Sequence, residues 1–187
     1  KIEIDEKTKK LLALLAIEIP DDIALKAKEI EKETNHDVKA VELSIAELLN
    51  EKYKSLVHFL LTSEDVNSLS YALIIKEANK LFAGKIDNLL ESLNTLRNQT
   101  AELPMLAKTH GQPASPTTLG KELNVFYTRL NRQNAQLEGQ KYFAKWAGAT
   151  GNYNAHILTL NSVDWPNETK NFLSELGIEH SNVSTQI

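Results

Sequence analysis

One long run of regularly spaced apolar residues constrains this sequence more than any other feature. Between about Ser63 and Glu102, apolar side chains recur at alternating spacings of three and four, the pattern of a helix with one apolar face. The residues that set the pattern are Val66, Leu69, Leu73, Phe82, Ile86, Leu89, Leu93, Leu96 and Leu103. Such a helix would extend roughly 55 to 60 Å, whereas an average globular helix has only about 11 residues. Gly84 weakens this helix without breaking it, and Pro104 ends it.

A second long helix is predicted after a loop that runs from Pro104 to Pro116. Ser115 is suited to cap the helix and Pro116 to occupy its first turn, where the missing N–H of proline does no harm. The apolar stripe continues to about Lys145 through Leu119, Leu123, Phe126, Leu130 and Leu137. Two adjacent helices with narrow apolar seams can bury those seams only against further helices, in this chain or another copy. We therefore expect oligomerisation through a shared helical bundle.

The rest of the chain also favours helices. A short charged helix is predicted over Asp21 to Lys32, and another near Lys170 to Leu176. A further helix is predicted from about Asp37 to Asn50, with Thr34 and Asp37 resembling a capping box. Alternation of apolar and polar residues, the pattern of a β-strand, is almost absent and argues against a sheet. The expected fold class is all-α, a bundle of long helices.

Composition removes several classes of function. The chain has no cysteine, which excludes disulfide scaffolds, thiol nucleophiles, iron–sulfur clusters and cysteine-based zinc sites, and which suits a reducing cytoplasm. The net charge of −4 gives no overall attraction for nucleic acid or anionic lipid. No stretch approaches the roughly 20 apolar residues that a membrane span needs. We expect a cytoplasmic protein that binds neither nucleic acid nor membrane and holds any anionic ligand with local donors.

The segment THGQPA, residues 109–114, is the first candidate for chemistry. A histidine such as His110, held in a loop, can give or take a proton near neutral pH. Gly111 and Pro113 restrict the backbone that would aim its imidazole. The alternative is a histidine that is only hydrogen-bonded within a turn.

A second candidate lies at the predicted start of the long helix. Thr62 and Ser63 place two hydroxyls beside the free N–H groups of a helix N-terminus, which favours a phosphate or carboxylate ligand. In the alternative interpretation, Ser63 caps the helix while Glu64 and Asp65 complement the helix dipole.

The remaining candidates give weaker signals. Asn35, His36 and Asp37 precede another predicted helix, where they either bind a ligand such as ribose hydroxyls and base edges or serve as a cap. His58 either joins the cluster at Thr62 or packs as a histidine whose polar atoms are satisfied. The signals of His156 and His180 are weaker still. No spacing typical of metal ligands is present, and we expect neither a metal nor a cofactor.

Five segments, taken together, point to a known family. They are TNHDVKAVE (34–42), HFLLTSED (58–65), KTHGQPASPTTLGKE (108–122), GNYNAH (151–156) and STQI (184–187). In order, spacing and position on the predicted helices, they resemble the adenylosuccinate lyase family of the fumarase and aspartase superfamily. The resemblance covers most of the chain. The residues His-Gly-Gln-Pro-Ala after Thr109 are similar to this branch, because argininosuccinate lyases and fumarases carry different residues after the shared Thr-His.

The resemblance implies cleavage of a carbon–nitrogen bond by β-elimination, without a cofactor. Adenylosuccinate would give AMP and fumarate, and succinylaminoimidazole carboxamide ribotide would give AICAR and fumarate. His110 would be the general acid for the departing nitrogen, and Thr62 and Ser63 would contact the anionic part of this nucleotide substrate. The resemblance implies substrate-binding roles for Asn35, His36, Asp37 and Gln186. It places His58 near the phosphate.

The resemblance also implies what the chain lacks. The family's general base, a serine in a mobile loop, would lie beyond Ile187, and an arginine-bearing segment would precede Lys1. We therefore expect an internal fragment that is inactive alone, truncated at both ends of its helical bundle. Residues 1–60 would be the remainder of an N-terminal helical domain, and residues 61–187 the first part of the central bundle domain. The intact protein would be a homotetramer whose active sites are shared between subunits.

Two alternatives stay open from the sequence. One is another fumarate-releasing lyase, such as argininosuccinate lyase. The other is a non-catalytic helical scaffold, in which the clustered His, Thr, Ser and Asn residues at helix starts only cap the helices.

Overall fold

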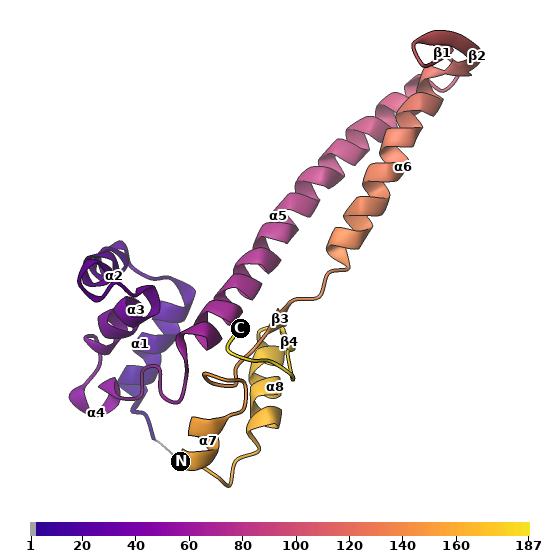
Figure 1. The fold of residues 1–187 in the computed structure, drawn as a ribbon. Helices are drawn as coiled ribbons and strands as arrows, with labels where there is room; N and C mark the ends of the chain where they lie inside the picture. The colour runs from indigo at the N-terminus through magenta and orange to yellow at the C-terminus, as the bar shows by residue number, and fades with distance from the viewer. Residues whose placement is uncertain (1–2) are drawn as a thin grey trace. The chain divides into compact units, whose positions relative to one another are not determined.

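A computed structural model describes residues 3–187 of the chain (Figure 1). Two compact units are present, one made of the residues up to Tyr71 together with Phe143–Ile187, the other of Ala72–Tyr142. The 37-residue helix α5, Ser63–Gln99, begins in the first unit and ends in the second. This helix confirms the long element predicted from the apolar spacing. Residues 1–2 of the predicted N-terminal domain lie outside the described residues, and the predicted division at residue 60 stays a prediction.

In the second unit, α5 runs beside helix α6, Leu119–Glu138, and a β-hairpin joins the two helices (Figure 1). The hairpin consists of the antiparallel strands β1, Pro104–Thr109, and β2, Gln112–Thr118. At its base, the N–H of Leu119 donates to the carbonyl of Leu103 at 2.9 Å. The hairpin itself is mostly exposed.

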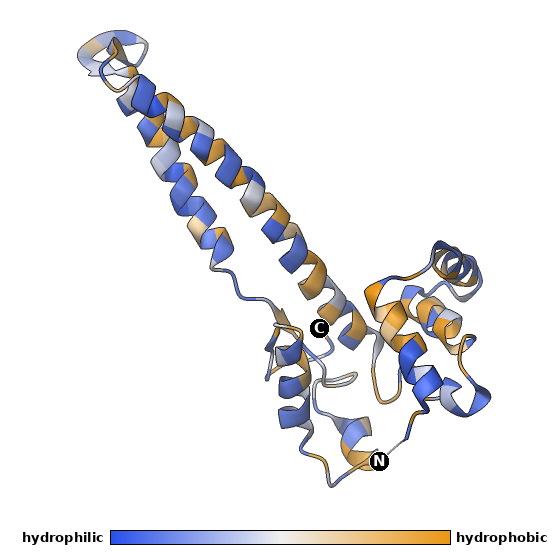
Figure 2. Cartoon of the chain, turned by 180° about the vertical axis from the view of Figure 1, so that it is seen from behind, coloured by the Kyte–Doolittle hydropathy of each residue, from blue (hydrophilic) through white to orange (hydrophobic). Residues whose placement is uncertain are grey.

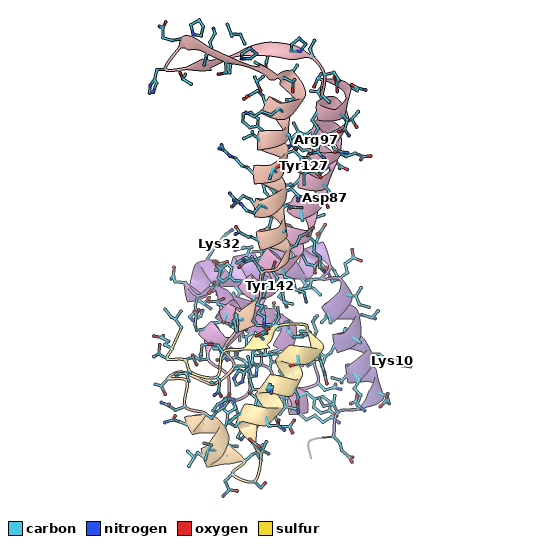
Figure 3. The ribbon with its side chains drawn as sticks, turned by 90° about the vertical axis from the view of Figure 1, so that its right-hand side faces the viewer. Lys10, Lys32, Asp87, Arg97, Tyr127 and Tyr142 are labelled. Atoms are coloured by element: carbon cyan, nitrogen blue, oxygen red, sulfur yellow. The ribbon has the colours of Figure 1, made fainter. Side chains whose placement is uncertain are left out.

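Polar and aromatic contacts link α5 to α6. The guanidinium of Arg97 lies over the ring of Tyr127, 3.9 Å from its centroid, and the two side chains point toward one another in Figure 3. Further along, the amide of Asn134 donates to the carboxylate of Asp87 at 2.9 Å. At the start of α6, Gly120 lies against the main chain that follows α5, where an added Cβ would lie 2.6 Å from the Cα of Ala101. Only glycine allows this approach.

The hairpin contradicts two predictions from the sequence. The segment predicted as a loop up to Pro116 forms two strands, and the second long helix begins at Leu119 with Thr118 as its cap, the Thr118 hydroxyl accepting from the N–H of Lys121 at 3.2 Å. Pro116 pairs opposite Leu106 in β2 and does not start the helix. A two-stranded hairpin tolerates proline because each strand has an edge that needs no N–H donor. The helix also ends at Glu138, earlier than the predicted Lys145.

The N-terminal part of the first unit is helical. Its helices are α1, Glu6–Ile17, α2, Asp21–Thr34, α3, Asp37–Ala46, and the short α4, Glu51–Lys54. The structure confirms α2 and the start of α3, whereas the sequence analysis missed α1 and α4, and α3 ends before the predicted Asn50. The predicted capping box with Thr34 is wrong: the Thr34 hydroxyl donates to the carbonyl of Ile30, and His36 caps α3.

The C-terminal part of the first unit contains a two-residue parallel pairing and two helices. The strands are β3, Phe143–Ala144, and β4, Glu179–His180, and the helices are α7, Asn154–Thr159, and α8, Trp165–Glu175. Helix α8 starts before the predicted Lys170 because the side chain of Asp164 accepts from the N–H of Asn167 and caps it. A small core forms from Ala144, Ala147, Leu173 and Ile178. The expectation that the chain has no sheet is therefore wrong for two short pairings, although helices dominate as predicted.

Large apolar side chains remain exposed along the long helices. Figure 2 shows apolar and polar residues alternating over both α5 and α6. The exposed apolar residues of these helices include Tyr71, Ile74, Leu81, Phe82, Leu89, Leu96 and Phe126. Among residues 3–187, no helix combines the length and the hydropathy that crossing a bilayer requires.

Candidate functional site

The junction between α2 and α3 positions two of the predicted site residues. Asn35 ends α2 in the left-handed conformation, with φ of 51°, and its N–H donates to the carbonyl of Glu31. His36 then caps α3 because its Nδ1 accepts from the N–H of Lys39 at 3.3 Å. The reversal of the chain at Asn35 thus leaves the His36 ring at the start of the next helix.

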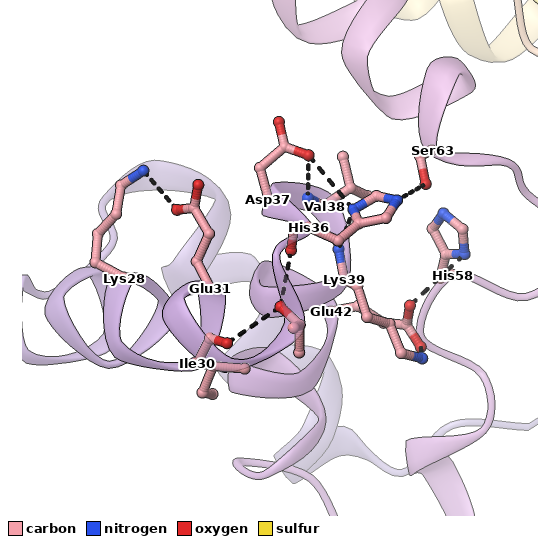
Figure 4. Close-up of polar contacts among 11 residues, drawn as sticks. Lys28, Ile30, Glu31, His36, Asp37, Val38, Lys39, Glu42, His58 and Ser63 are labelled. Atoms are coloured by element: carbon pink, nitrogen blue, oxygen red, sulfur yellow. Dashed lines mark hydrogen bonds and ion pairs between the residues drawn. The ribbon is translucent and has the colours of Figure 1, made fainter.

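The His36 ring reaches the first residue of α5. Its Nε2 lies 3.2 Å from the Ser63 hydroxyl oxygen (Figure 4). In the neutral ring, Nδ1 accepts from Lys39 and the proton is therefore on Nε2, which donates to the Ser63 oxygen. The Ser63 hydroxyl then keeps its own hydrogen for another acceptor. The structure brings His36 and Ser63 together, with the Ser63 hydroxyl facing the His36 ring from the first residue of α5.

Asp37 offers His36 a second state. One carboxylate oxygen of Asp37 lies 3.4 Å from Nδ1 of His36 and also accepts from the N–H of Val38 at 2.7 Å. A protonated His36 would direct its Nδ1–H to this carboxylate, because the same nitrogen cannot then accept from Lys39. In both states Nε2 carries hydrogen toward Ser63. The Asp37 carboxylate is largely exposed and therefore accessible to a ligand.

Asp65 holds the start of α5 from the inside. The carboxylate is completely buried and accepts from the N–H groups of Thr62 at 3.0 Å, Ala147 at 3.0 Å and Gly148 at 3.1 Å. Asp65 lies in the first turn of α5, as the capping interpretation expects, and its carboxylate is buried there. The N–H of Thr62, which precedes the helix, is also already occupied.

Lys145 completes this buried arrangement. Its ammonium lies 2.8 Å from the Asp65 carboxylate and donates to the carbonyl of Gly148 at 2.8 Å, while its own N–H donates to the Ser68 hydroxyl at 3.1 Å. Only 2% of the Lys145 side chain is exposed. The segment 144–148 is therefore tied to the first turns of α5 by both main chain and side chain.

His156 lies beside the same arrangement. It is almost fully buried, its ring contacts those of Tyr153 and Trp165, and its Nδ1 has no hydrogen-bond partner among residues 3–187. Burial lowers the pKa of His156 below its ordinary value, and the charge of Asp65 opposes this shift in part. Burial, together with Lys170, also lowers the pKa of His180. His156 is thus a buried side chain, whereas His180 is half-buried with its Nε2 3.1 Å from the Tyr153 hydroxyl.

The ring nitrogens of His58 have fewer hydrogen-bond partners than those of a packed histidine whose polar atoms are satisfied. Its backbone is left-handed, with φ of 63°, and its Nδ1 lies 3.8 Å from a carboxylate oxygen of Glu42. Its Nε2 is buried and has no hydrogen-bond partner within the described part of the chain. Figure 4 shows the His58 ring in the same region as His36 and Ser63. The alternative of a histidine whose polar atoms are all satisfied thus fails at Nε2, and the membership of His58 in the cluster at Thr62 stays a prediction.

The C-terminal segment of the first unit presents Gln186 on the surface. Upstream of it, the main chain of Ser184 lies against Gly151, where an added Cβ would be 2.7 Å from the carbonyl carbon of Ser184. Gly151 also has φ of 76°, so both its backbone conformation and the close approach of Ser184 require glycine there. The packing of the segments GNYNAH and STQI against one another fixes the chain just before Gln186.

His110 belongs to the second unit. It forms, with Gly111, the two-residue turn between Thr109 and Gln112, and both turn residues have positive φ, 49° and 75°. This is the turn geometry that matches the twist of a β-hairpin. The His110 side chain is exposed at the tip. The first-unit cluster and His110 are thus in different units, and their convergence on one ligand stays a prediction.

Sequence reasoning missed Asp65, Lys145 and Glu42 as parts of the site's surroundings. The partners of Asp65 include main-chain N–H groups more than 80 residues away, which carry no side-chain signal. Glu42 lies within the segment TNHDVKAVE, but nothing in the sequence indicated its contact with His58.

Comparison with known proteins agrees across most of the chain. The sequence profile of a family described as lyase matches residues 3–177. The chain is 45% identical over 190 residues to adenylosuccinate lyase of Legionella pneumophila, a match that covers 98% of this chain and 42% of that protein. The chain therefore spans less than half the length of this relative.

Two solved structures share the fold. A fumarate lyase from Mesorhizobium sp. BNC1 aligns with a TM-score of 0.70 at 19% identity, covering 92% of this chain and 46% of that one. β-Carboxy-cis,cis-muconate cycloisomerase from Acinetobacter calcoaceticus sp. ADP1 aligns with a TM-score of 0.75 at 16% identity, covering 97% and 42%. The expected fold class, with its long helices of the fumarase and aspartase type, is confirmed.

Proposed function

The chain belongs to the lyase family, and from this membership we propose that the intact protein is an adenylosuccinate lyase. It removes fumarate from adenylosuccinate to leave AMP, and from succinylaminoimidazole carboxamide ribotide to leave AICAR. In each case a proton leaves the carbon beside a carboxylate, the carbon–nitrogen bond breaks, and the departing nitrogen takes up a proton. The high identity to a protein of that name along nearly the whole chain carries the proposal.

The first-unit cluster suits the anionic part of such a substrate. Ser63 keeps a hydroxyl hydrogen that it can donate, since Nε2 of His36 donates to its oxygen. Thr62 adds a second hydroxyl at the same helix start, where the helix dipole favours negative charge. Asn35, His36, Asp37 and Gln186 are the other proposed substrate contacts, and His58 is proposed to lie near the phosphate.

His110 is the proposed general acid. Its exposed position at the tip of a tight turn leaves both ring nitrogens accessible, as proton transfer to a departing nitrogen requires. Because His110 and the first-unit cluster belong to different units, we propose that they meet through the assembly of subunits.

A homotetramer with shared active sites is part of the same proposal. The apolar side chains that α5 and α6 leave exposed, such as Leu81 at 76% and Phe126 at 63%, are what further helices of a bundle would cover. Light scattering on the intact protein should give the mass of four subunits. A monomer would remove this part of the proposal.

An assay of fumarate release tests the reaction. The intact protein should release fumarate from adenylosuccinate and not from argininosuccinate, and the reverse preference would favour the alternative lyase. If neither substrate reacts and AMP fails to bind saturably, the non-catalytic scaffold is favoured. Because the resemblance places the general base beyond Ile187, the 187 residues alone should release no fumarate. The cytoplasmic location expected from the sequence stays a prediction.

A further inference from the structure

We propose that Glu42 is a positioning residue that orients the imidazole of His58, so that Nε2 of His58 faces an anionic group of the substrate. This inference rests on the proposed lyase function. It concerns a residue that does not itself touch the substrate.

The first observation is the asymmetry of the His58 ring. One nitrogen, Nδ1, lies 3.8 Å from the Glu42 carboxylate, and the side chains of both residues are about one-fifth exposed, 20% and 19%. The other nitrogen, Nε2, is buried without a hydrogen-bond partner in the described residues. Buried polar atoms normally have partners, so a buried ring nitrogen without one invites a ligand group.

The second observation is that Glu42 is itself held. Its other carboxylate oxygen lies 2.7 Å from the ammonium of Lys39, one turn earlier on α3. The main-chain N–H of Lys39 also donates to Nδ1 of His36. Helix α3 therefore sets the directions of both histidine rings, His36 through its cap and His58 through Glu42 (Figure 4).

The third observation is the backbone at His58. Both His58 and Leu60 have left-handed φ values, 63° and 65°, which residues with a Cβ rarely adopt. Such conformations persist where the surrounding structure holds them in place, and they concentrate at ligand sites. The chain thus bends around His58 in a way that places its ring against Glu42.

These contacts decide what His58 can bind. A carboxylate beside Nδ1 accepts hydrogen from that nitrogen. An imidazole that also binds an anion through Nε2 does so as the imidazolium, with hydrogen on both nitrogens. In the imidazolium, Nε2 also carries hydrogen and needs an acceptor, and a carboxylate or phosphate oxygen supplies the strongest one. The chemical class of ligand at Nε2 is therefore an anionic oxygen.

The test uses the intact protein with adenylosuccinate as the probe. Glu42→Gln should raise KM about tenfold while kcat changes less than about twofold, because a charge-assisted contact in binding is weakened while the reacting groups are untouched. Glu47→Gln is the matched control: Glu47 ends the same helix and pairs with Lys26, away from His58. Its KM should not change. An unchanged KM in Glu42→Gln would overturn the inference.

A double-mutant cycle separates positioning from a general structural effect. In a His58→Gln background, Glu42→Gln should have no further effect on KM, because its route to the substrate is gone. An equal effect in both backgrounds would also overturn the inference.

Nitrogen NMR of His58 gives a readout that needs no activity. In the wild type, Nδ1 should carry hydrogen, and Glu42→Gln should shift the Nδ1 and Nε2 signals, whereas Glu47→Gln should not. If the intact wild type fails to turn over adenylosuccinate, the proposed function is wrong, and these spectra still decide the orientation of His58.

Discussion

The two units of this chain hold their candidate reactive side chains in different ways. In the first unit, two pairs of polar side chains near the start of α5 are in contact: His36 contacts Ser63, and the buried Asp65 contacts Lys145. In the second unit, His110 stands exposed on a tight turn above two helices that leave apolar residues uncovered. The first unit is organised by its own contacts, whereas the second presents surfaces and a reactive side chain for something else to complete.

The strongest way to break the first unit is to remove one partner of its buried ion pair. Lys145→Met leaves the Asp65 carboxylate buried with only N–H donors, and such losses cost about 3–5 kcal/mol of unfolding free energy. Urea unfolding should show this loss, and hydrogen exchange should accelerate in the first unit before α6. The exposed Lys10→Met is the control, with a cost under about 0.5 kcal/mol. A similarly small cost for Lys145→Met would mean that the pair does not hold the unit.

The second unit should lose activity without losing stability. His110→Ala in the intact protein should lower turnover of adenylosuccinate about a hundredfold or more, because the general acid is gone, while substrate binding survives. His110→Asn keeps a residue suited to the left-handed turn and should show the same loss. Unchanged turnover in both variants would remove His110 from the mechanism.

Two glycines of the second unit test how tightly its helices pack. Gly120→Ala would push a Cβ into the main chain of Ala101 and should cost about 1–3 kcal/mol. Gly84→Ala is the matched control: nothing lies within 4 Å of its added Cβ, so the better helix former should raise stability by about 0.8–1 kcal/mol. Thermal unfolding of both variants measures the difference. Equal effects would show that α5 and α6 are loosely packed at Gly120.

The smallest expected effect is the pH dependence of the first unit. Burial lowers the pKa of His156 in the folded state, so as the pH falls below the ordinary value of 6.5 the unfolded chain takes up a proton first. Stability should therefore decrease from pH 7 toward lower pH, and His180 adds a change of the same sign. Urea unfolding at a series of pH values measures the slope, and His156→Gln should reduce it. A slope that His156→Gln leaves unchanged would assign the effect to other groups.

The sequence predicted elements whose cause is local or periodic. The spacing of Val66, Leu69 and their successors repeats for ten turns, which is why α5 was predicted nearly to its ends. The β-hairpin was missed because Ser115 and Pro116 together imitate a helix start, whereas their actual environment is set by pairing with β1. The local sequence at Ser115 and Pro116 is compatible with both a helix start and a strand, and only the pairing with β1 decides between them.

The sequence indicated candidate site residues, which stay predictions, but not the contacts that hold them in place. The segments that carry His36, Ser63 and His110 were recognisable in the sequence, because the residues that make up each segment are neighbours in the chain. The burial of Asp65 depends on N–H groups from Ala147 and Gly148, which any residue except proline would offer. The orientation of His58 likewise depends on a left-handed backbone conformation that the residues next to it in the sequence do not predict.

The unbroken course of α5 restricts how genes for such proteins can change in length. Adding or deleting one residue inside this helix would turn every later side chain by about 100° around the axis. The apolar seam and the bonds of Asp87 and Arg97 to α6 would then face the wrong direction. Insertions and deletions among natural variants should therefore collect in the connecting segments, such as the links flanking α4 and α8, and leave the rod at constant length.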